Sequence, residues 1–307
     1  MPFPSFYDPD RIGLNYRPDT ERAISAGLAA GLAPAEHDDP TTLLLLVDPQ
    51  VDFIHTDGAL SVPGAVEDTR RTIEWLYAHA GEVSAIAASL DSHVPLQIFY
   101  PTWWRDQEGR PPKPYTTITG EQVEAGTWHP TRLPAWSVAY VRQLETRSKK
   151  QLMIWPYHTM VGSPGHDLTP ALYEAIMYHA AARQTQPRYV HKGSLPQTEY
   201  YSLLEPEVKV PDDAGGQTNV AFFNEMMSFD RVYIAGQAKS HCVLETLLTV
   251  DRLLGDDRPA MGKMHLLEDC TSSVQHPDID FDSMATESLD RLAARGLHRL
   301  TSADPLD

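Results

Sequence analysis

The stretch that decides the fold runs Val232-Tyr233-Ile234-Ala235-Gly236-Gln237-Ala238-Lys239-Ser240-His241-Cys242-Val243. Its first residues are an apolar run typical of a buried strand, the run ends at Gly236, and a helical pattern begins at Cys242. A strand that turns directly into a helix is the repeating unit of parallel α/β folds. The free N–H groups at a helix start favour negative charge, so we expect the Cys242 thiol to ionise readily.

The rest of the chain repeats this alternation of short β-rich runs and helical patterns. The predicted strands lie near residues 43–47, 83–88, 152–154, 188–191, 231–235 and 264–267. The predicted helices cover residues 66–79, 170–182, 219–227, 242–254 and 281–294. The sequence therefore predicts an α/β fold: a three-layer α/β/α sandwich around a mostly parallel, roughly six-stranded, Rossmann-like sheet.

Two stretches stand outside this alternation. Residues 1–40 are predicted to form an N-terminal arm with a short helix over 20–32. Residues 41–307 are predicted to form a single domain, interrupted at about 101–150 by an insertion rich in proline and tryptophan. This insertion is longer than an ordinary α/β connection, so it is either a lid or a packing surface.

Composition narrows the kind of partner. The chain of 307 residues carries 25 basic and 42 acidic side chains, a net charge of −17, which disfavours nucleic acids and anionic membranes. Its longest aliphatic run, residues 43–47, is far shorter than the roughly 20 residues of a membrane span. Two cysteines are too few for a disulfide framework. We therefore expect a cytoplasmic protein that acts on small molecules.

Chemically active residues follow the predicted strands. In an open parallel sheet the ligand site lies at the carboxyl ends of the strands, and the residues there are Asp48, Asp91, His93, Trp155, His158, Lys192, Cys242, Asp269 and Cys270. Taken singly, Asp48 would be an ordinary turn carboxylate and Lys192 a solvated lysine. Together with Cys242 they make a workable nucleophile, because the carboxylate can accept the thiol proton while the ammonium stabilises anions.

A second set, Asp91, His93 and His158, offers one carboxylate and two imidazoles. Such ligands suit Zn²⁺, Mn²⁺ or Fe²⁺ and leave coordination positions open for water or substrate. His241 adjoins Cys242 but is a poor candidate for its base, because neighbouring helical residues point about 100° apart. Cys270 is explained by packing.

These motifs carry a resemblance to a known family. Residues 45–53, Asp91-x-His93, Trp155-Pro156-x-His158, Lys192-Gly193 and the stretch 236–243 follow one another in the order of the isochorismatase-like cysteine hydrolases. Within that superfamily they are similar to the nicotinamidase branch.

The resemblance implies a role for each matched position. Asp48, Lys192 and Cys242 match the catalytic triad, and Asp91, His93 and His158 match the metal ligands of one divalent ion, Zn²⁺ before Mn²⁺ or Fe²⁺. Phe53 and Trp155 match the aromatic walls around the substrate ring, and Ala238 and Cys242 match the oxyanion hole, with a cis peptide expected between Ala238 and Lys239. Because oligomers are common in the family, a homo-oligomer is implied as well.

The implied activity is metal-dependent deamidation of a small heteroaromatic or aromatic carboxamide such as nicotinamide, through a Cys242 thioester. Departures from the family pattern qualify the substrate: Lys239-Ser240 replaces the usual Thr-Asp, and Gln97 and Phe99 stand where many members have another histidine. The alternative is a related hydrolase of ureido, carbamoyl or aliphatic amides. A metal-free isochorismatase and a non-catalytic family member are the weaker alternatives.

Overall fold

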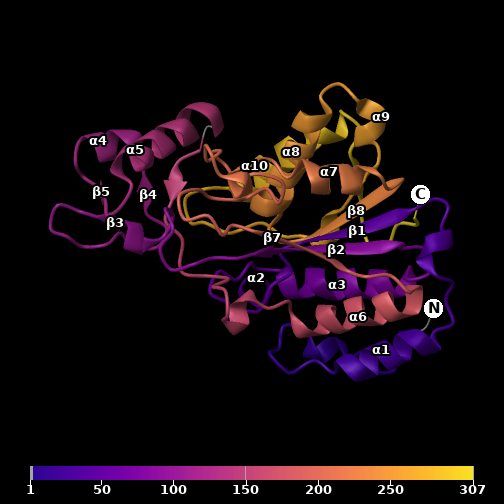
Figure 1. Ribbon diagram of the computed structural model, residues 1–307. Coiled ribbons are helices and arrows are strands. Elements are labelled where there is room, and N and C mark those ends of the chain that lie inside the picture. The colour runs from indigo at the N-terminus through magenta and orange to yellow at the C-terminus, as the bar shows by residue number, and fades with distance from the viewer. Residues whose placement is uncertain (1–2, 149, 307) are drawn as a thin grey trace.

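The computed structural model describes residues 3–148 and 150–306, and it is built on one central sheet (Figure 1). The six strands are all parallel, in the order β10-β9-β8-β1-β2-β7. They are β1 (Thr42–Val47), β2 (Ala85–Asp91), β7 (Arg188–Lys192), β8 (Arg231–Gly236), β9 (Met264–Leu267) and β10 (His298–Leu300). The predicted α/β class is confirmed, and the central sheet is wholly parallel.

Helices cover both faces of the sheet (Figure 1). One face carries α3 (Ala65–Ala78) and α6 (Pro170–Arg183), and the other carries α7 (Val220–Met227), α8 (Leu244–Leu254), the short α9 (Arg258–Met261) and α10 (Phe281–Ala293). All six residues of β1 are buried, with Leu44 and Leu46 in the first core and Leu43 and Leu45 in the second. This two-residue alternation inside a continuous apolar run explains why β1 lies at the centre of the sheet.

The N-terminal segment packs outside α6. Its helix α1 (Thr20–Ala29) runs beside α6 and forms an additional layer (Figure 1). Glu174 of α6 accepts hydrogen bonds from the Asp19 N–H (2.7 Å) and the Tyr16 hydroxyl (2.8 Å), and Arg183 forms an ion pair with Asp38. A few predicted positions lie outside the described residues: 1–2 of the predicted arm, 149 of the predicted insertion and 307 of the predicted domain.

The insertion is a folded lobe beside the sheet (Figure 1). It contains β3 (Trp104–Arg105), β4 (Thr117–Ile118), α4 (Gly120–Glu124), β5 (His129–Pro130) and α5 (Pro134–Gln143). Its buried side chains, among them Trp103, Trp104 and Tyr140, form one hydrophobic cluster with Phe53 and Trp155. The lobe is therefore a packing surface behind the predicted aromatic walls.

The structure corrects the membership of the sheet. The predicted strand over 152–154 does not join it: β6 (Leu152–Met153) pairs antiparallel with β4 in a separate two-stranded sheet. This apolar run ends at Trp155-Pro156, and a proline cannot donate a ladder hydrogen bond. The sixth strand is β10, which we missed because a short, partly exposed edge strand bearing His298 and Arg299 carries no apolar signature.

A four-residue helix, α2 (Val51–Ile54), follows β1 directly. The helix predicted from residue 242 begins at Leu244, after a π-helical turn over Lys239–Val243. Within the described residues, no helix is both long enough and apolar enough to cross a membrane.

Candidate active site

The strand order fixes where the site lies. From β1 the chain adds β2 and then β7 on one side, and it returns through β8 to the other side of β1. The sheet therefore reverses its winding between β1 and β8, and ligands of open α/β sheets bind outside such a switch point. Asp48 follows β1, and the turn carrying Cys242 follows β8. In the β2–β7 pair Asp91 lies directly opposite Lys192.

Gly236 allows β8 to turn beside β1. Its φ is +114°, and a Cβ built there would lie 2.1 Å from the Val47 carbonyl oxygen on the neighbouring strand. Any side chain would force the two strands apart. The glycine that ends the apolar run in the sequence is thus the residue that delivers Cys242 to the carboxyl end of β1.

Lys192 is the centre of the site. Its buried Nζ lies 3.0 Å from Asp48 Oδ2, 3.0 Å from Asp91 Oδ1, 2.8 Å from the Tyr200 carbonyl oxygen and 3.6 Å from Cys242 Sγ. Burial opposes its charge, but the two carboxylates hold the pKa of Lys192 well above its usual value. A protonated ammonium therefore contacts the predicted nucleophile Cys242, the predicted base Asp48 and the predicted metal ligand Asp91.

Asp48 is fully buried and fixed by a serine that the sequence analysis did not single out. The Ser89 hydroxyl donates to Asp48 Oδ1 (2.6 Å) and accepts from the Asp48 N–H (2.9 Å). Burial raises the pKa of Asp48 above its usual range, although Lys192 opposes the rise. A signal for Ser89 was present, because it is a polar residue in an apolar strand, two positions before Asp91 and so on the same face.

The Cys242 thiol does not ionise as readily as we expected. Cys242 lies inside the π-helical turn rather than at the start of α8, and its side chain is buried. Burial raises the pKa of the thiol well above its usual value, and a hydrogen bond with Asp48 raises it further, while Lys192 lowers it. The resting nucleophile is therefore a neutral thiol beside a carboxylate. Cys270 packs in the core on the α3 and α6 side of the sheet.

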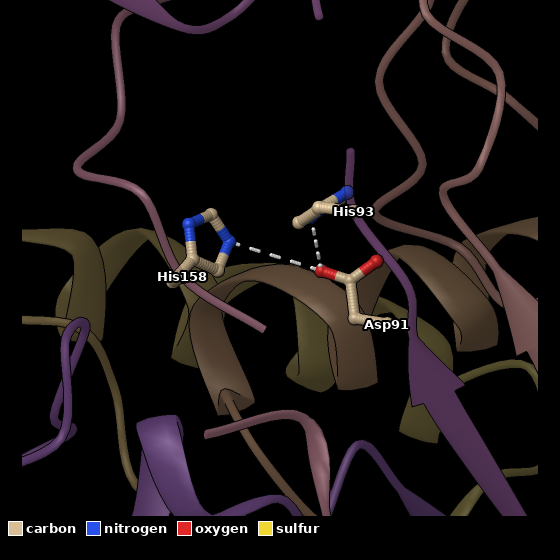
Figure 2. Close-up of side chains that lie close together, drawn as sticks. All are labelled: Asp91, His93 and His158. Atoms are coloured by element: carbon tan, nitrogen blue, oxygen red, sulfur yellow. Dashed lines mark ion pairs between the residues drawn. The ribbon is translucent and has the colours of Figure 1, made fainter. Parts of the chain in front are cut away.

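Asp91, His93 and His158 converge, with one ligand atom of each lying within 4.8 Å of the others (Figure 2). His93 Nε2 lies 2.9 Å and His158 Nε2 3.9 Å from Asp91 Oδ2. The two Nδ1 atoms face carbonyl oxygens, that of Gly193 for His93 (3.1 Å) and that of Pro156 for His158 (2.8 Å). Each ring thus donates from Nδ1 and keeps the Nε2 lone pair for a cation, as metal-ligating histidines do.

Two further observations fit a metal. The buried His93 Nε2 has no hydrogen-bond partner among the described residues, although it faces a carboxylate. At Gly193, whose φ is +79°, an added Cβ would lie 2.5 Å from Asp91 Oδ1 and 2.8 Å from His93 Cε1. Residue 193 therefore carries no side chain at the point where the predicted ligands Asp91 and His93 approach each other. One carboxylate and two imidazoles are a ligand set that divalent metal ions accept.

Gln97 and Phe99 do not extend this ligand set. The Gln97 amide donates to the Gly193 carbonyl oxygen (2.6 Å), and its oxygen accepts from the Val94 N–H (3.0 Å). The Phe99 ring packs edge-on against His93, with centroids 4.9 Å apart. Gln97 instead holds the carbonyl that orients the His93 ring.

A small cavity of about 30 Å³ connects the two groups of residues. Its lining includes the predicted nucleophile Cys242, the predicted metal ligands Asp91 and His158, the predicted walls Phe53 and Trp155, and Ala238 of the predicted oxyanion hole. Its further lining residues Glu199, Tyr201, His241 and Val274 had no assigned role in the sequence analysis. Typical ligand pockets measure roughly 300–1,000 Å³, so the cavity as it stands is smaller than a substrate ring requires.

Burial shifts the pKa of two cavity-lining residues, His241 and Glu199, toward their neutral forms. Burial lowers the pKa of His241 to about 3, and its ring stands edge-on to Trp155 and Tyr201. Burial raises the pKa of Glu199 to about 7. The cis peptide bond lies between Gln237 and Ala238, one residue earlier than predicted.

Comparison with known proteins agrees with this geometry. No protein-family model matches the chain. A nicotinamidase of Saccharomyces cerevisiae is 23% identical over 210 residues, which cover 68% of this chain and 81% of the relative. The structure of the yeast nicotinamidase bound to the inhibitor nicotinaldehyde superposes with a TM-score of 0.57 at 19% identity, covering 85% of this chain and 100% of that one. A pyrazinamidase of Pyrococcus horikoshii in complex with zinc gives a TM-score of 0.50 at 19% identity, covering 85% and 99%.

The resemblance indicated by the motifs is thereby confirmed, and the chain has the fold of these structures.

Proposed function

We propose that the protein is a cysteine amidohydrolase that converts a small aromatic or heteroaromatic carboxamide, such as nicotinamide, into the acid and ammonia. One observation carries the proposal. A single buried ammonium, Lys192 Nζ, contacts a carboxylate, a thiol and a second carboxylate beside an aromatic-walled cavity. The yeast relative, named as a nicotinamidase, supports this choice of substrate.

The chemistry begins from the neutral thiol. Asp48 accepts the thiol proton as Cys242 Sγ attacks the amide carbonyl carbon, and Lys192 balances the charge on Asp48. We assign the N–H groups of Ala238 and Cys242 to the tetrahedral oxyanion, an assignment supported by their shared place in the cavity lining. Asp48 then returns the proton to the leaving nitrogen, and ammonia departs from a Cys242 thioester.

The second half of the reaction uses the same base. Asp48 accepts a proton from the attacking water, the thioester C–S bond breaks, and the proton passes to Cys242 Sγ. The products are the carboxylic acid and the regenerated thiol. The raised pKa of Asp48 suits this role, because a base that must also act as an acid works best with a pKa near the operating pH.

Asp91, His93 and His158 are the proposed ligands of one divalent ion, with Zn²⁺ favoured over Mn²⁺ or Fe²⁺. Such an ion supplies Lewis acidity and a fixed positive charge next to the cavity. The group of three ligands and the zinc complex of the archaeal pyrazinamidase support this part of the proposal. The cytoplasmic location and the homo-oligomer stay predictions.

A second candidate, hydrolysis of small aliphatic, ureido or carbamoyl amides, is favoured by the altered turn before Cys242. Lys239 Nζ forms an ion pair with Asp282 (2.5 Å), and the Ser240 hydroxyl accepts from the N–H of Val274 (3.1 Å), a residue of the cavity wall. The Ser240 contact fixes Val274, one residue of the cavity lining, beside the turn that carries Cys242.

The test is an ammonia-release panel of nicotinamide, an aliphatic amide and a ureido compound, run with metal-depleted and metal-reconstituted enzyme. Variants C242A and C270A are assayed beside the wild type. We expect nicotinamide to be preferred, metal to restore activity, and C242A alone to be inactive. Loss of turnover in C270A but not in C242A would overturn the assignment, and preference for the aliphatic or ureido compound would select the second candidate.

A further inference from the structure

A second lysine, half-buried, lies beside the aromatic wall of the cavity. Lys150 Nζ contacts Glu207 Oε2 (2.8 Å) and Glu245 Oε1 (2.6 Å), and it stands 5.0 Å from the centroid of the Tyr201 ring. We call Lys150, Glu207 and Glu245 the Lys150 cluster. None of its members lines the cavity, and the mechanism above does not use them.

The Lys150 cluster joins three parts of the chain. Lys150 ends the insertion, Glu207 lies in the segment between β7 and α7, and Glu245 is in the first turn of α8, three residues after Cys242. Glu207 is further fixed because its N–H donates to the Glu199 carbonyl oxygen (2.9 Å). A single ammonium thus holds the insertion against the helix that follows the nucleophile.

Tyr201 connects the Lys150 cluster to the cavity. Its hydroxyl accepts a hydrogen bond from Trp155 Nε1 (3.2 Å), and its ring stands edge-on to His241 with centroids 5.3 Å apart. Tyr201, Trp155 and His241 all line the cavity. A cation on the outer face of Tyr201 attracts the ring, and the attraction grows when the pair is desolvated. The Lys150 ammonium therefore holds the Tyr201 ring without lining the cavity in which the substrate would lie.

The charge on Lys150 is secure. Burial opposes protonation, but Glu207 and Glu245 hold the pKa of Lys150 above its usual value. The Lys150 side chain is only 28% exposed and that of Glu207 only 6%. Removal of the ammonium would leave the Glu207 and Glu245 carboxyl groups without the cation that they share, and Tyr201 without the charge beside its ring.

We propose that Lys150 is a positioning residue that holds the Tyr201–Trp155 wall against the substrate ring and so sets the preference for aromatic over aliphatic amides. The proposal rests on the proposed amidohydrolase function. Lys150 acts on an aromatic substrate through ring packing, and an aliphatic amide has no ring to pack. Its loss therefore acts on KM for one substrate class and leaves the chemical step alone.

The test compares K150M with K150R and with K263M. Lys263 is a matched control, because it is a partly buried lysine at the opposite end of the sheet, bonded to the carbonyl oxygens of Met227 and Phe229. For K150M we expect KM for nicotinamide to rise by roughly tenfold, with kcat within about twofold and KM for an aliphatic amide unchanged. K150R should restore most of the nicotinamide KM, and K263M should behave as wild type.

Equal changes for both substrates, or none in folded K150M, would overturn the proposal. If K150M does not fold, E245Q tests the same cluster with one partner weakened, and we expect a smaller shift in the same direction. A readout without turnover is acrylamide quenching of Trp155, taken as the difference between each protein and its W155F version. Greater exposure of Trp155 in K150M supports the proposal, and unchanged quenching refutes it. A wild type inactive on every amide would refute the proposed function, while the quenching would still decide the role of Lys150.

Discussion

The sharpest test of the mechanism is Asp48→Asn, because asparagine has the same shape but cannot accept the thiol proton. The amide oxygen of the variant can still accept the Ser89 hydroxyl that now donates to Oδ1 at 2.6 Å. The bond with Ser89 should therefore survive, while the amide nitrogen takes the place of Oδ2 and faces Lys192 Nζ, which keeps Asp91 Oδ1 and the Tyr200 carbonyl oxygen as acceptors. A positioned general base contributes about 10²–10⁴ in rate, which corresponds to roughly 3–5 kcal/mol of activation free energy.

The effect on stability should be smaller. Removing one partner of a buried ion pair costs about 3–5 kcal/mol when the other charge is left alone. Lys192 is not left alone, since Asp91 Oδ1 at 3.0 Å and the Tyr200 carbonyl oxygen at 2.8 Å remain. The variant also relieves the burial of the Asp48 charge, which raises the pKa of that carboxyl. We therefore expect the free energy of unfolding to change by less than about 3 kcal/mol.

The assay is ammonia release under conditions that give kcat and KM separately, with thermal unfolding of the same samples. Asp230→Asn is the matched control, because Asp230 Oδ2 accepts bonds from Thr41 (2.8 and 2.9 Å) at the amino end of β1, and an amide oxygen can do the same. We expect D48N to lose at least a hundredfold in kcat, and D230N to match the wild type. A folded D48N with turnover within tenfold of wild type would refute Asp48 as the base.

Three further predictions follow from the geometry. Burial raises the pKa of the Cys242 thiol, so alkylation of Cys242 by iodoacetamide should be slow at neutral pH and should accelerate as the pH rises above the usual thiol range. An alkylation rate that does not depend on pH between about 6 and 9 would contradict a neutral resting thiol. Gly193→Ala should weaken metal binding by about 10- to 100-fold, measured by competition with a chromogenic chelator, because the added Cβ would lie 2.5 Å from Asp91 Oδ1; unchanged affinity would argue against a metal at this position. Burial lowers the pKa of His179 to about 4, so this histidine is neutral when folded and takes up a proton on unfolding below its usual pKa of about 6.5. It should contribute up to about 3 kcal/mol of stability above pH 6.5, and this contribution is lost as the pH falls toward 4. In His179→Gln the amide can still donate to the Val83 carbonyl oxygen, so chemical denaturation should show that the free energy of unfolding falls less steeply over that pH range. An unchanged slope would contradict this account.

Much of the fold could be predicted because the signal for a buried parallel strand is strong. β1 is apolar on both faces, so its leucines reveal a central position in the sheet without any knowledge of its neighbours. The edge strand β10 carries His298 and Arg299 and has no such pattern. Two-residue strands such as β6 take their partner from tertiary contacts, which local periodicity does not encode.

Much of the candidate site was predictable from residues that follow a strand, although Asp269 and Cys270 also follow one and do not line the cavity. Lys192 and Asp91 are register partners, so their proximity follows from the pairing of β2 with β7. Tyr201 and Glu199 lie in an irregular segment after β7, and no periodicity places them in the cavity. Ser89 was the exception, since a lone serine in a buried strand should have prompted a search for its partner.

The protonation of Cys242 shows where reasoning from a local motif is insufficient. A helix start favours a thiolate, but that field acts within the first turn and is worth at most about 2 kcal/mol. Burial acts on the same group in the opposite direction, and here it outweighs the effect of Lys192 on the pKa of the thiol. Lys192 does not interact with Cys242 alone, because Asp48 and Asp91 each lie 3.0 Å from the same Nζ. In the resting site the ammonium already faces two carboxylates. Under the proposed mechanism the proton therefore leaves sulfur only when Asp48 takes it, and nucleophile formation and carbonyl attack are one coupled event.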